Sequence, residues 1–249
     1  MNSIGDAVVH IGPVLAVAMV LLVALAMAVN HVSGFATSTL VAAIRAVVQL
    51  AILAALLATV MPRLWASALF VAVMAVTAAW TSAGRVTHDL SRVRTTARCL
   101  VPAAAPTLVI VLLLVIIGVL PATGIAIIPT AGIMLGAAMV TTSLAGRRAH
   151  DELGTRHGEV EAALSLGFLP RDARLEICRQ AAATALIPGL DQTRSVGLVT
   201  IPGAFVGMVL GGASVVSAAI MQLFVLVALL AVTAIAMAVT LEMVARDYL

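Results

Sequence analysis

Residues 147–212 read RRAHDELGTRHGEVEAALSLGFLPRDARLEICRQAAATALIPGLDQTRSVGLVTIPGAFVGMVLGG, and this stretch decides the fold. It holds seven of the fourteen arginines of the chain, yet from Val196 onward it has no charged residue. A proline and several glycines lie in that apolar part, and both residue types allow a helix to break. A water-facing segment is therefore joined directly to a membrane segment that can bend.

The composition is that of a polytopic α-helical membrane protein. Hydrophobic residues make up 63% of the 249 residues, and charged residues only 10%. Several apolar runs approach or exceed the ~20 residues that a helix needs to cross a ~30 Å hydrocarbon core. A transmembrane barrel is disfavoured, because its strands alternate polar and apolar residues whereas these runs are continuously apolar. We predict an all-α fold.

Seven membrane spans are predicted within one transmembrane domain, residues 1–249. Their boundaries are 7–29, 38–60, 66–84, 103–120, 123–145, 195–217 and 219–242. The polar segment 147–194 separates the fifth span from the sixth and is predicted to be a helical coupling loop.

The arginines predict the orientation, since short arginine-rich loops stay in the cytoplasm. The loops 85–98 and 147–194 hold most of the arginines, and the turns 121–124 and 211–219 hold none. We therefore expect a multi-pass protein of the cell (inner or plasma) membrane. Its N-terminus should lie outside and its C-terminus in the cytoplasm.

The chain contains no lysine. A Walker A loop needs its lysine to reach the β- and γ-phosphates of ATP, so this chain cannot carry a standard one. If transport is driven by ATP, the ATPase is another polypeptide. An intramembrane enzyme is also poorly supported, because the sequence has no HExxH motif and no acidic pair within a span. We expect neither a catalytic residue nor a cofactor in this chain.

The second predicted span contains Arg45 and Gln49. They are four positions apart and therefore share a helix face. An arginine inside an apolar segment normally faces a polar cavity or a partner. The alternative is that Arg45 extends its side chain to the cytoplasmic end of the span. The sequence leaves both interpretations open.

Two predicted spans carry small residues at every fourth position. These are Gly132 and Gly136 in the fifth span, and Gly203, Gly207 and Gly211 in the sixth. Such a row lets another backbone approach, either within the chain or across a dimer seam. Pro129 and Pro202 lie in the same spans, and each removes one backbone hydrogen bond. We predict that the translocation path lies beside these two prolines.

The coupling loop is predicted to be a helix, a sharp bend and a second helix. Residues 159–168, EVEAALSLGF, favour a helix as far as Gly167, and Pro170 stands at a favourable first-turn position of the next one. The sequence Glu161-Ala162-Ala163, followed after three residues by Gly167, resembles the EAA loop of ABC transporter permeases. In those proteins this loop forms a short cytoplasmic helix that lies in a cleft of the ATPase subunit.

The resemblance becomes specific when further stretches are added, namely RAVVQL, PTAGIMLGAAM, EVEAALSLG and ALIPGLDQTRSVGLVTIPGAFVGMVLGGAS. Together they resemble the FetB (YbbM) family of ABC permeases, which includes plant aluminium-sensitivity permeases. The resemblance implies a homodimeric permease with two copies of a separate ATPase, which binds ATP and Mg²⁺. It implies export of iron or another metal across the membrane, and no nucleic-acid partner.

Some residues depart from that family pattern towards apolar side chains. They are Ala137, Phe205, Val206 and Met208, all beside the predicted path. An ABC permease for a lipid, or for a small polar solute such as a nucleotide sugar, is therefore the alternative to a metal exporter.

No metal site is predicted. The cluster His150-Asp151-Glu152 is better explained as a solvated helix with the i,i+4 pairs Arg147–Asp151 and Arg148–Glu152. The methionines beside the path, Met134, Met139 and Met208, are soft sulfur donors, but methionine is also a common gap-filler in apolar helices.

Overall fold

The computed structural model describes residues 12–32, 34–86 and 92–249. This part of the chain is built from helices and contains no β-strand beyond an isolated bridge between Val196 and Thr200. Five of its helices are long and apolar enough to cross a membrane. The number is six if one bent pair of helices is counted as a single crossing. The prediction of an all-α, polytopic membrane fold is confirmed.

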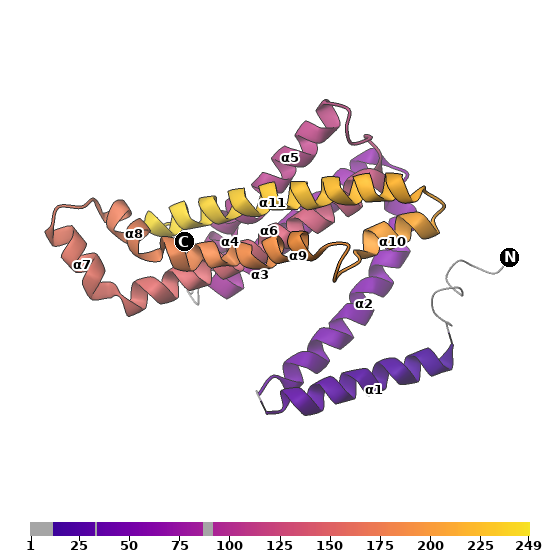
Figure 1. Cartoon of the computed structure of the whole chain (residues 1–249), viewed down its shortest axis with the longest axis horizontal. Coiled ribbons are helices and arrows are strands. Elements are labelled where there is room, and N and C mark those ends of the chain that lie inside the picture. Colours follow the sequence, from indigo (N-terminus) through magenta and orange to yellow (C-terminus); the bar gives the residue numbers. More distant parts are fainter. Residues whose placement is uncertain (1–11, 33, 87–91) are drawn as a thin grey trace.

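The first two helices form an N-terminal arm that projects from the rest of the molecule (Figure 1). They are α1 (Pro13–Asn30) and α2 (Ala36–Val60), which meet at a short turn and diverge from it as a V (Figure 1). No residue of α1 is buried. The predicted first span begins at residue 7, and its residues 7–11 lie outside the described part. The arm presents apolar side chains on all sides, as lipid-facing helices do.

The centre of the fold consists of α3 (Leu64–Val86), α6 (Gly124–Thr155) and α11 (Val215–Ala245). Helix α3 buries Ala75 in the core that it shares with α6, and it buries Ala79 and Ala83 in a cluster with Cys99 of α4 (Arg92–Ala103). Small side chains at such positions bring two backbones close together. The 32 residues of α6 extend about 48 Å and the 31 residues of α11 about 46 Å, so both continue beyond a ~30 Å hydrocarbon core.

The predicted span 103–120 differs from the structure. Helix α4 (Arg92–Ala103) and helix α5 (Ala105–Ile116) meet at a bend of 40°. Pro106 lies in the first turn of α5 and has no N–H to donate back to α4. The crossing is therefore a bent pair that begins well before residue 103.

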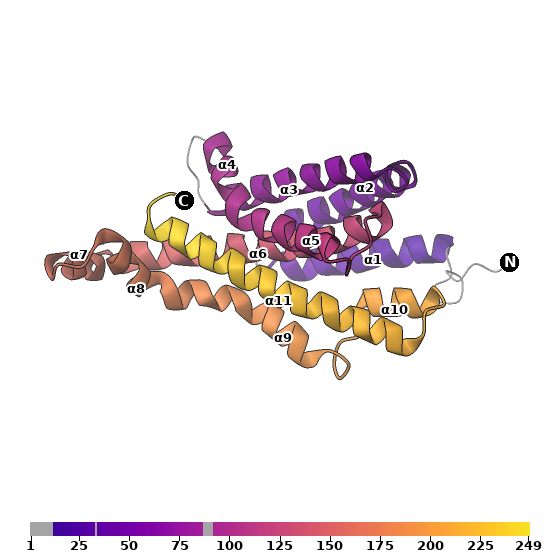
Figure 2. The same cartoon turned by 90° about the horizontal axis from the view of Figure 1, so that it is seen from above.

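The predicted span 195–217 is not a single helix. Helix α9 (Ile187–Ser195) is followed by an irregular segment, residues 196–202, and then by the eight-residue helix α10 (Gly203–Leu210). Gly197 has a positive φ of 79° and Pro202 caps α10, so neither position continues a helix. Gly212, with φ 93°, then turns the chain into α11. Figure 2 shows α9 and α10 lying one after the other along α11.

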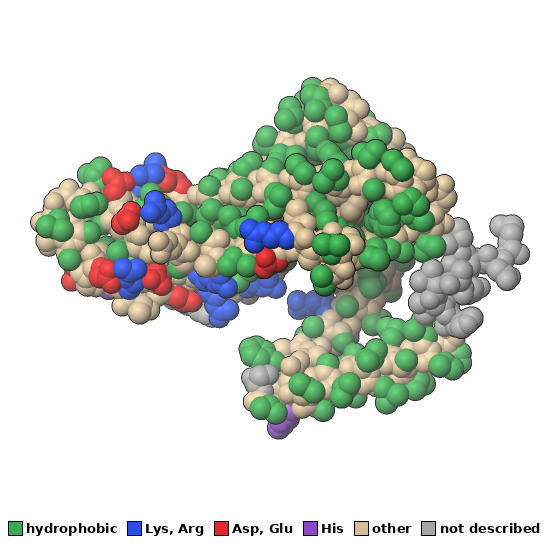
Figure 3. Space-filling model, viewed as in Figure 1, with side chains coloured by type: hydrophobic (Ala, Val, Ile, Leu, Met, Phe, Trp, Pro, Cys, Tyr) green, Lys and Arg blue, Asp and Glu red, His purple; other side chains and the backbone are tan. Residues whose placement is uncertain are grey.

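Two short helices form the end of the molecule opposite α10 (Figure 2). They are α7 (His157–Ser165) and α8 (Pro170–Ala183), and a 3₁₀ turn, η2 (Thr184–Leu186), joins α8 to α9. Residues 147–155 of the predicted coupling loop continue α6 without a break, and their charges place them beyond the apolar part of that helix. Charged side chains gather over this end, whereas the rest of the face seen in Figure 3 is mainly hydrophobic.

Candidate functional site: a helical hairpin and the cavities beside α10

The α7–α8 hairpin turns at Gly167, as the sequence predicts. Gly167 has φ 91°, a conformation that residues with a Cβ rarely adopt. Its N–H donates to the carbonyl of Leu164 (3.0 Å), and the N–H of Phe168 donates to that of Ala163 (3.1 Å). These two bonds form a Schellman motif. Pro170 then starts α8, where its missing N–H costs nothing.

The corner of the hairpin exposes large apolar side chains. Leu166 is 81% exposed, Leu169 68% and Phe168 51%, and we call these three residues the apolar tip. The predicted coupling residues surround this tip: Glu161, Ala162, Gly167 and Pro170 are exposed, and Ala163 is half-buried. Large apolar groups at a water-facing corner are typical of protein interaction sites. The coupling role of these residues stays a prediction.

Ion pairs attach the hairpin to the end of α11. Arg171 donates from Nε and Nη2 to the two carboxylate oxygens of Glu242, at 2.8 and 2.7 Å. Arg174 pairs with Asp247 at 3.0 Å. The hydrogen bonds to Glu242 and then to Asp172 raise the pKa of Arg171 above its ordinary value. A two-point guanidinium–carboxylate contact fixes direction as well as distance, so α8 and α11 are held in one orientation.

The charged cluster near residue 150 is paired differently from the prediction. Arg156 donates to Glu152 (3.2 Å) and to both oxygens of Glu159, while Arg148 donates to Thr184. The hydrogen bonds from Arg156 lower the pKa of Glu159. The predicted pair Arg148–Glu152 is therefore replaced by one that links α6 to α7. It braces the junction through which the hairpin is attached.

Two cavities lie beside α10, within the membrane part of the fold. The first, of about 360 Å³, is bordered by Pro202, Phe205 and the N-terminal part of α11. The second, of about 200 Å³, is bordered by Pro129, α10 and α11. Each of the prolines that the sequence singles out thus borders a cavity. That these cavities belong to a translocation path stays a prediction.

Gln222 lines both cavities and was missed by the sequence analysis. It is only 7% exposed, and its Oε1 has no hydrogen-bond partner among the described residues. The signal that could have revealed it is the one that singles out Gln49: a glutamine within an apolar span. Buried polar groups are normally hydrogen-bonded, so this amide is an exception that requires an explanation.

The glycine rows do not make close contacts within the chain. A Cβ added at Gly136, Gly203 or Gly207 would meet no atom within 4 Å; at Gly132 it would meet the end of Met74, and at Gly211 only carbonyls of α10 itself. The close approaches occur elsewhere. A Cβ at Gly124 would lie 2.5 Å from the carbonyl oxygen of Met61, and one at Gly146 would lie 2.8 Å from Val86.

Arg45 and Gln49 lie on one face of α2, as the four-residue spacing predicts. Together with Thr37 and Ser38 they line an open groove of about 410 Å³ on the N-terminal arm. None of these residues borders the cavities at Pro129 and Pro202. The groove on α2 and the two cavities beside α10 therefore share no lining residue.

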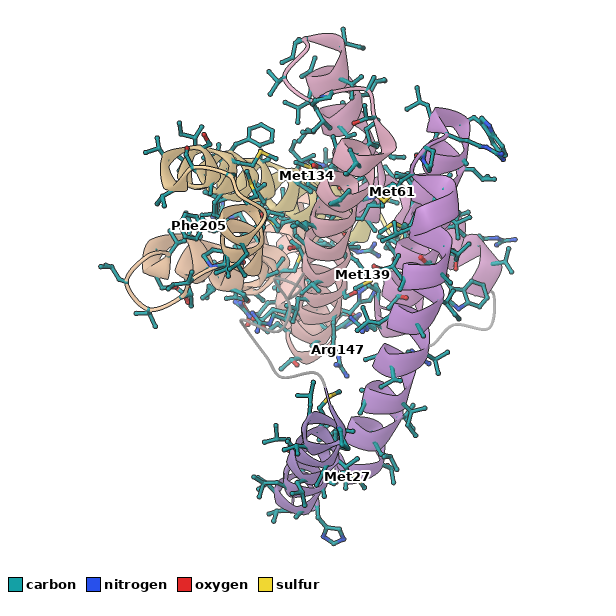
Figure 4. All side chains as sticks on the ribbon, turned by 90° about the vertical axis from the view of Figure 1, so that its right-hand side faces the viewer. Met27, Met61, Met134, Met139, Arg147 and Phe205 are labelled. Carbon is teal, nitrogen blue, oxygen red and sulfur yellow. The ribbon has the colours of Figure 1, made fainter. Side chains whose placement is uncertain are left out.

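The labelled methionines are spread over several elements. Met27 lies on the N-terminal arm, away from Met134 and Met139 on α6 (Figure 4). Met134 is fully buried in the core between α3, α6 and α11, where a flexible side chain fills irregular space. Its position favours the packing interpretation for this methionine.

Comparisons with known proteins give a consistent picture. Residues 12–249 match the family described as "Uncharacterised protein family (UPF0014)". The chain is 34% identical over 215 residues to "UPF0014 membrane protein STAR2" of Oryza sativa subsp. japonica, an alignment that covers 86% of this chain and 74% of the relative.

Two further relatives match over a shorter region. The chain is 38% identical over 122 residues to "Protein ALUMINUM SENSITIVE 3" of Arabidopsis thaliana, covering 49% of this chain and 45% of the relative. It is 30% identical over 122 residues to the "Probable iron export permease protein FetB" of Escherichia coli (strain K12), covering 49% and 47%. In these two comparisons the chain spans just under half of the relative. No solved structure matches the chain.

Proposed function

Since the chain belongs to the UPF0014 family of membrane proteins, we propose that it is the permease subunit of an ABC transporter and works with a separate ATPase. The observation that carries the proposal is the α7–α8 hairpin, which exposes the apolar tip at the charged end of an otherwise apolar molecule. A cleft in a soluble ATPase would cover the tip. The chain itself then transports and does not hydrolyse ATP.

In this mechanism the hairpin transmits movement to the membrane cavities. Nucleotide-driven closure of the ATPase displaces α7, which follows directly on α6. Helix α8 moves with it and pulls on α11 through the contact of Arg171 with Glu242. Both long helices border the cavity at Pro129, so its shape changes when they shift relative to each other. ATP and Mg²⁺ are bound by the partner alone.

The working assembly is proposed to be a homodimer with two ATPase subunits. A second copy of the chain has room to pack on two surfaces. One is the open side of α10 at Gly203 and Gly207, and the other is the exposed N-terminal arm. The C-terminal end of α11 lies at the same end as the hairpin, and Arg98 donates to the carbonyl of Tyr248 there (2.7 Å). This arrangement supports a cytoplasmic C-terminus and an N-terminus outside.

The cargo is proposed to be iron or another metal, moved outward. The printed name of the Escherichia coli relative, a probable iron export permease, supports this choice. The uncharged cavities beside α10 favour the second candidate, a lipid or a small polar solute. Cellular metal content, measured with and without the gene by inductively coupled plasma mass spectrometry, separates the two. Unchanged iron content and peroxide tolerance would exclude iron export.

The coupling role is tested by co-purification of the chain with its ATPase. The double substitution Leu166→Asp and Phe168→Asp places two charges on the apolar tip and should abolish co-purification and coupled ATPase activity. Val93→Asp is the matched control, because Val93 is 75% exposed and lies on α4, outside the hairpin. If the tip variant retains its ATPase as the control does, the proposed docking site is wrong.

A further inference from the structure

Gln222 is the starting point, because its side-chain oxygen is held without a hydrogen-bond partner among the described residues of a candidate membrane helix. It is 93% buried, it is the eighth residue of α11, and its Oε1 is unpaired among the described residues. The amide carries both a donor and an acceptor, whichever way it is turned. A buried polar atom is costly without a hydrogen-bond partner, so an amide held in this position is suited to bind a polar group that enters the cavities.

The two cavities give such a partner access to Gln222. One, of about 360 Å³, lies on the side of Phe205 and Pro202, and the other, of about 200 Å³, lies on the side of Met208 and Met221. Their lining is mostly apolar, with no charged residue, and Thr130 adds one hydroxyl to the second. This combination of apolar walls with a few polar groups is characteristic of small-molecule sites.

Pro129 supplies a further polar group at the second cavity. It lies inside α6 and has no N–H, so the carbonyl of Ile125, four residues earlier, lacks its usual helical donor. Both residues line that cavity. A carbonyl freed in this way is tolerated in a membrane helix where a cavity or its contents can satisfy it.

The chemistry of these groups disfavours charged ligands. A hard cation requires several oxygen ligands, usually carboxylates, and no acidic residue lines either cavity. The N-terminus of α10 at Pro202 borders the first cavity and attracts negative charge, but no arginine lines either cavity to pair with an anion. An amide, a hydroxyl and a free carbonyl instead match a neutral group that donates and accepts hydrogen bonds.

We propose that the cavities beside α10 form a binding site for an uncharged amphiphile, whose hydroxyl or amide head hydrogen-bonds to Gln222 and whose hydrocarbon part lies against Phe205 and Leu226. Binding of this kind needs no ATPase. Only the further step, that the bound molecule is cargo, rests on the proposed function.

The test uses the full chain in lipid nanodiscs and a diazirine-bearing octanol as the photoactivatable probe. Label should be found by mass spectrometry on residues 201–208 and 219–226, which border the cavities. Unlabelled octanol should compete for labelling, whereas octane, octylammonium and ferrous ion should not. Gln222→Leu should weaken labelling of these segments about tenfold, the factor that one net hydrogen bond supplies.

Gln49→Leu is the control variant, because Gln49 lies in α2 and borders neither cavity. It should label as the wild type does. The competition is carried out on the wild-type chain, so its outcome does not depend on the folding of a variant. Equal competition by octane, stronger competition by octylammonium or ferrous ion, or label spread evenly over all helices would each overturn the proposal. Loss of ATPase docking with labelling retained would count against the proposed function alone.

Discussion

Replacing Gly167 by alanine tests whether the corner between α7 and α8 must keep its shape. Gly167 has φ 91°, and a Cβ at this position would meet no atom within 4 Å. The substitution therefore removes no contact and causes no clash, and its whole effect is conformational. A residue with a Cβ pays about 1–2 kcal/mol for a left-handed backbone. Gly167→Ala should accordingly shift the corner away from the conformation that presents the apolar tip.

The assay is the affinity of the purified ATPase for the permease in nanodiscs, read by surface plasmon resonance. If docking selects the observed corner, 1–2 kcal/mol corresponds to a loss of about 5- to 30-fold in affinity. Gly158→Ala is the matched control, because Gly158 lies in α7 without a positive φ and also has open space around it. Equal affinities for Gly167→Ala and wild type, or an equal loss for Gly158→Ala, would refute the reasoning.

Three further predictions concern the packing and the ion pairs. Gly146→Val would force a side chain into the contact of α6 with α3, at a cost of about 1–3 kcal/mol, and should lower the melting temperature in detergent. Arg171→Leu leaves Glu242 without its partner on α8; ATPase binding should persist, while transport-dependent stimulation of ATP hydrolysis falls. The pKa of Glu159 lies below its ordinary value of 4.5, so its contact with Arg156 stabilises the fold above that pH and is lost as the pH falls through the lowered pKa. An acid titration followed by circular dichroism should show a smaller change for Glu159→Gln.

The sequence predicts the fold class and the corner of the hairpin because both follow from local chemistry. Continuous apolar runs with few charges can only be membrane helices. A glycine that ends a helical pattern and is followed by a proline specifies a turn and a new start, and Gly167 and Pro170 form that turn here.

Hydropathy could not predict that the span 195–217 is broken into two helices and an irregular segment. Hydropathy measures how apolar a segment is, and residues 196–212 are apolar in either conformation. Their conformation depends on Gly197 and Gly212, which adopt positive φ, and on Pro202, which starts a new helix. Each of these residues can also occur inside a continuous membrane helix, so the sequence alone did not decide between the two structures.

The glycine motifs identified a helix face but not its partner, for a similar reason. A spacing of four places Gly203 and Gly207 on one helix face, but it does not say which way that face is turned. In the structure the close approach of α6 to α3 occurs at Gly146 and Val86, which no motif marked. Orientation within a bundle is a property of the whole fold.

Helix α11 is the element that unites the two parts of the candidate site. Gln222 and Glu242 are 20 residues apart on it, which corresponds to about 30 Å, the thickness of the hydrocarbon core. A continuous helix transmits a displacement over that length, whereas α10 has only eight residues and is bounded by Pro202 and the turn at Gly212. A pull on Glu242 should therefore move Gln222 relative to α10, because the short helix has no rigid connection to the hairpin. The cavities lie between these two helices, and their walls are the parts of the fold that such a movement would separate.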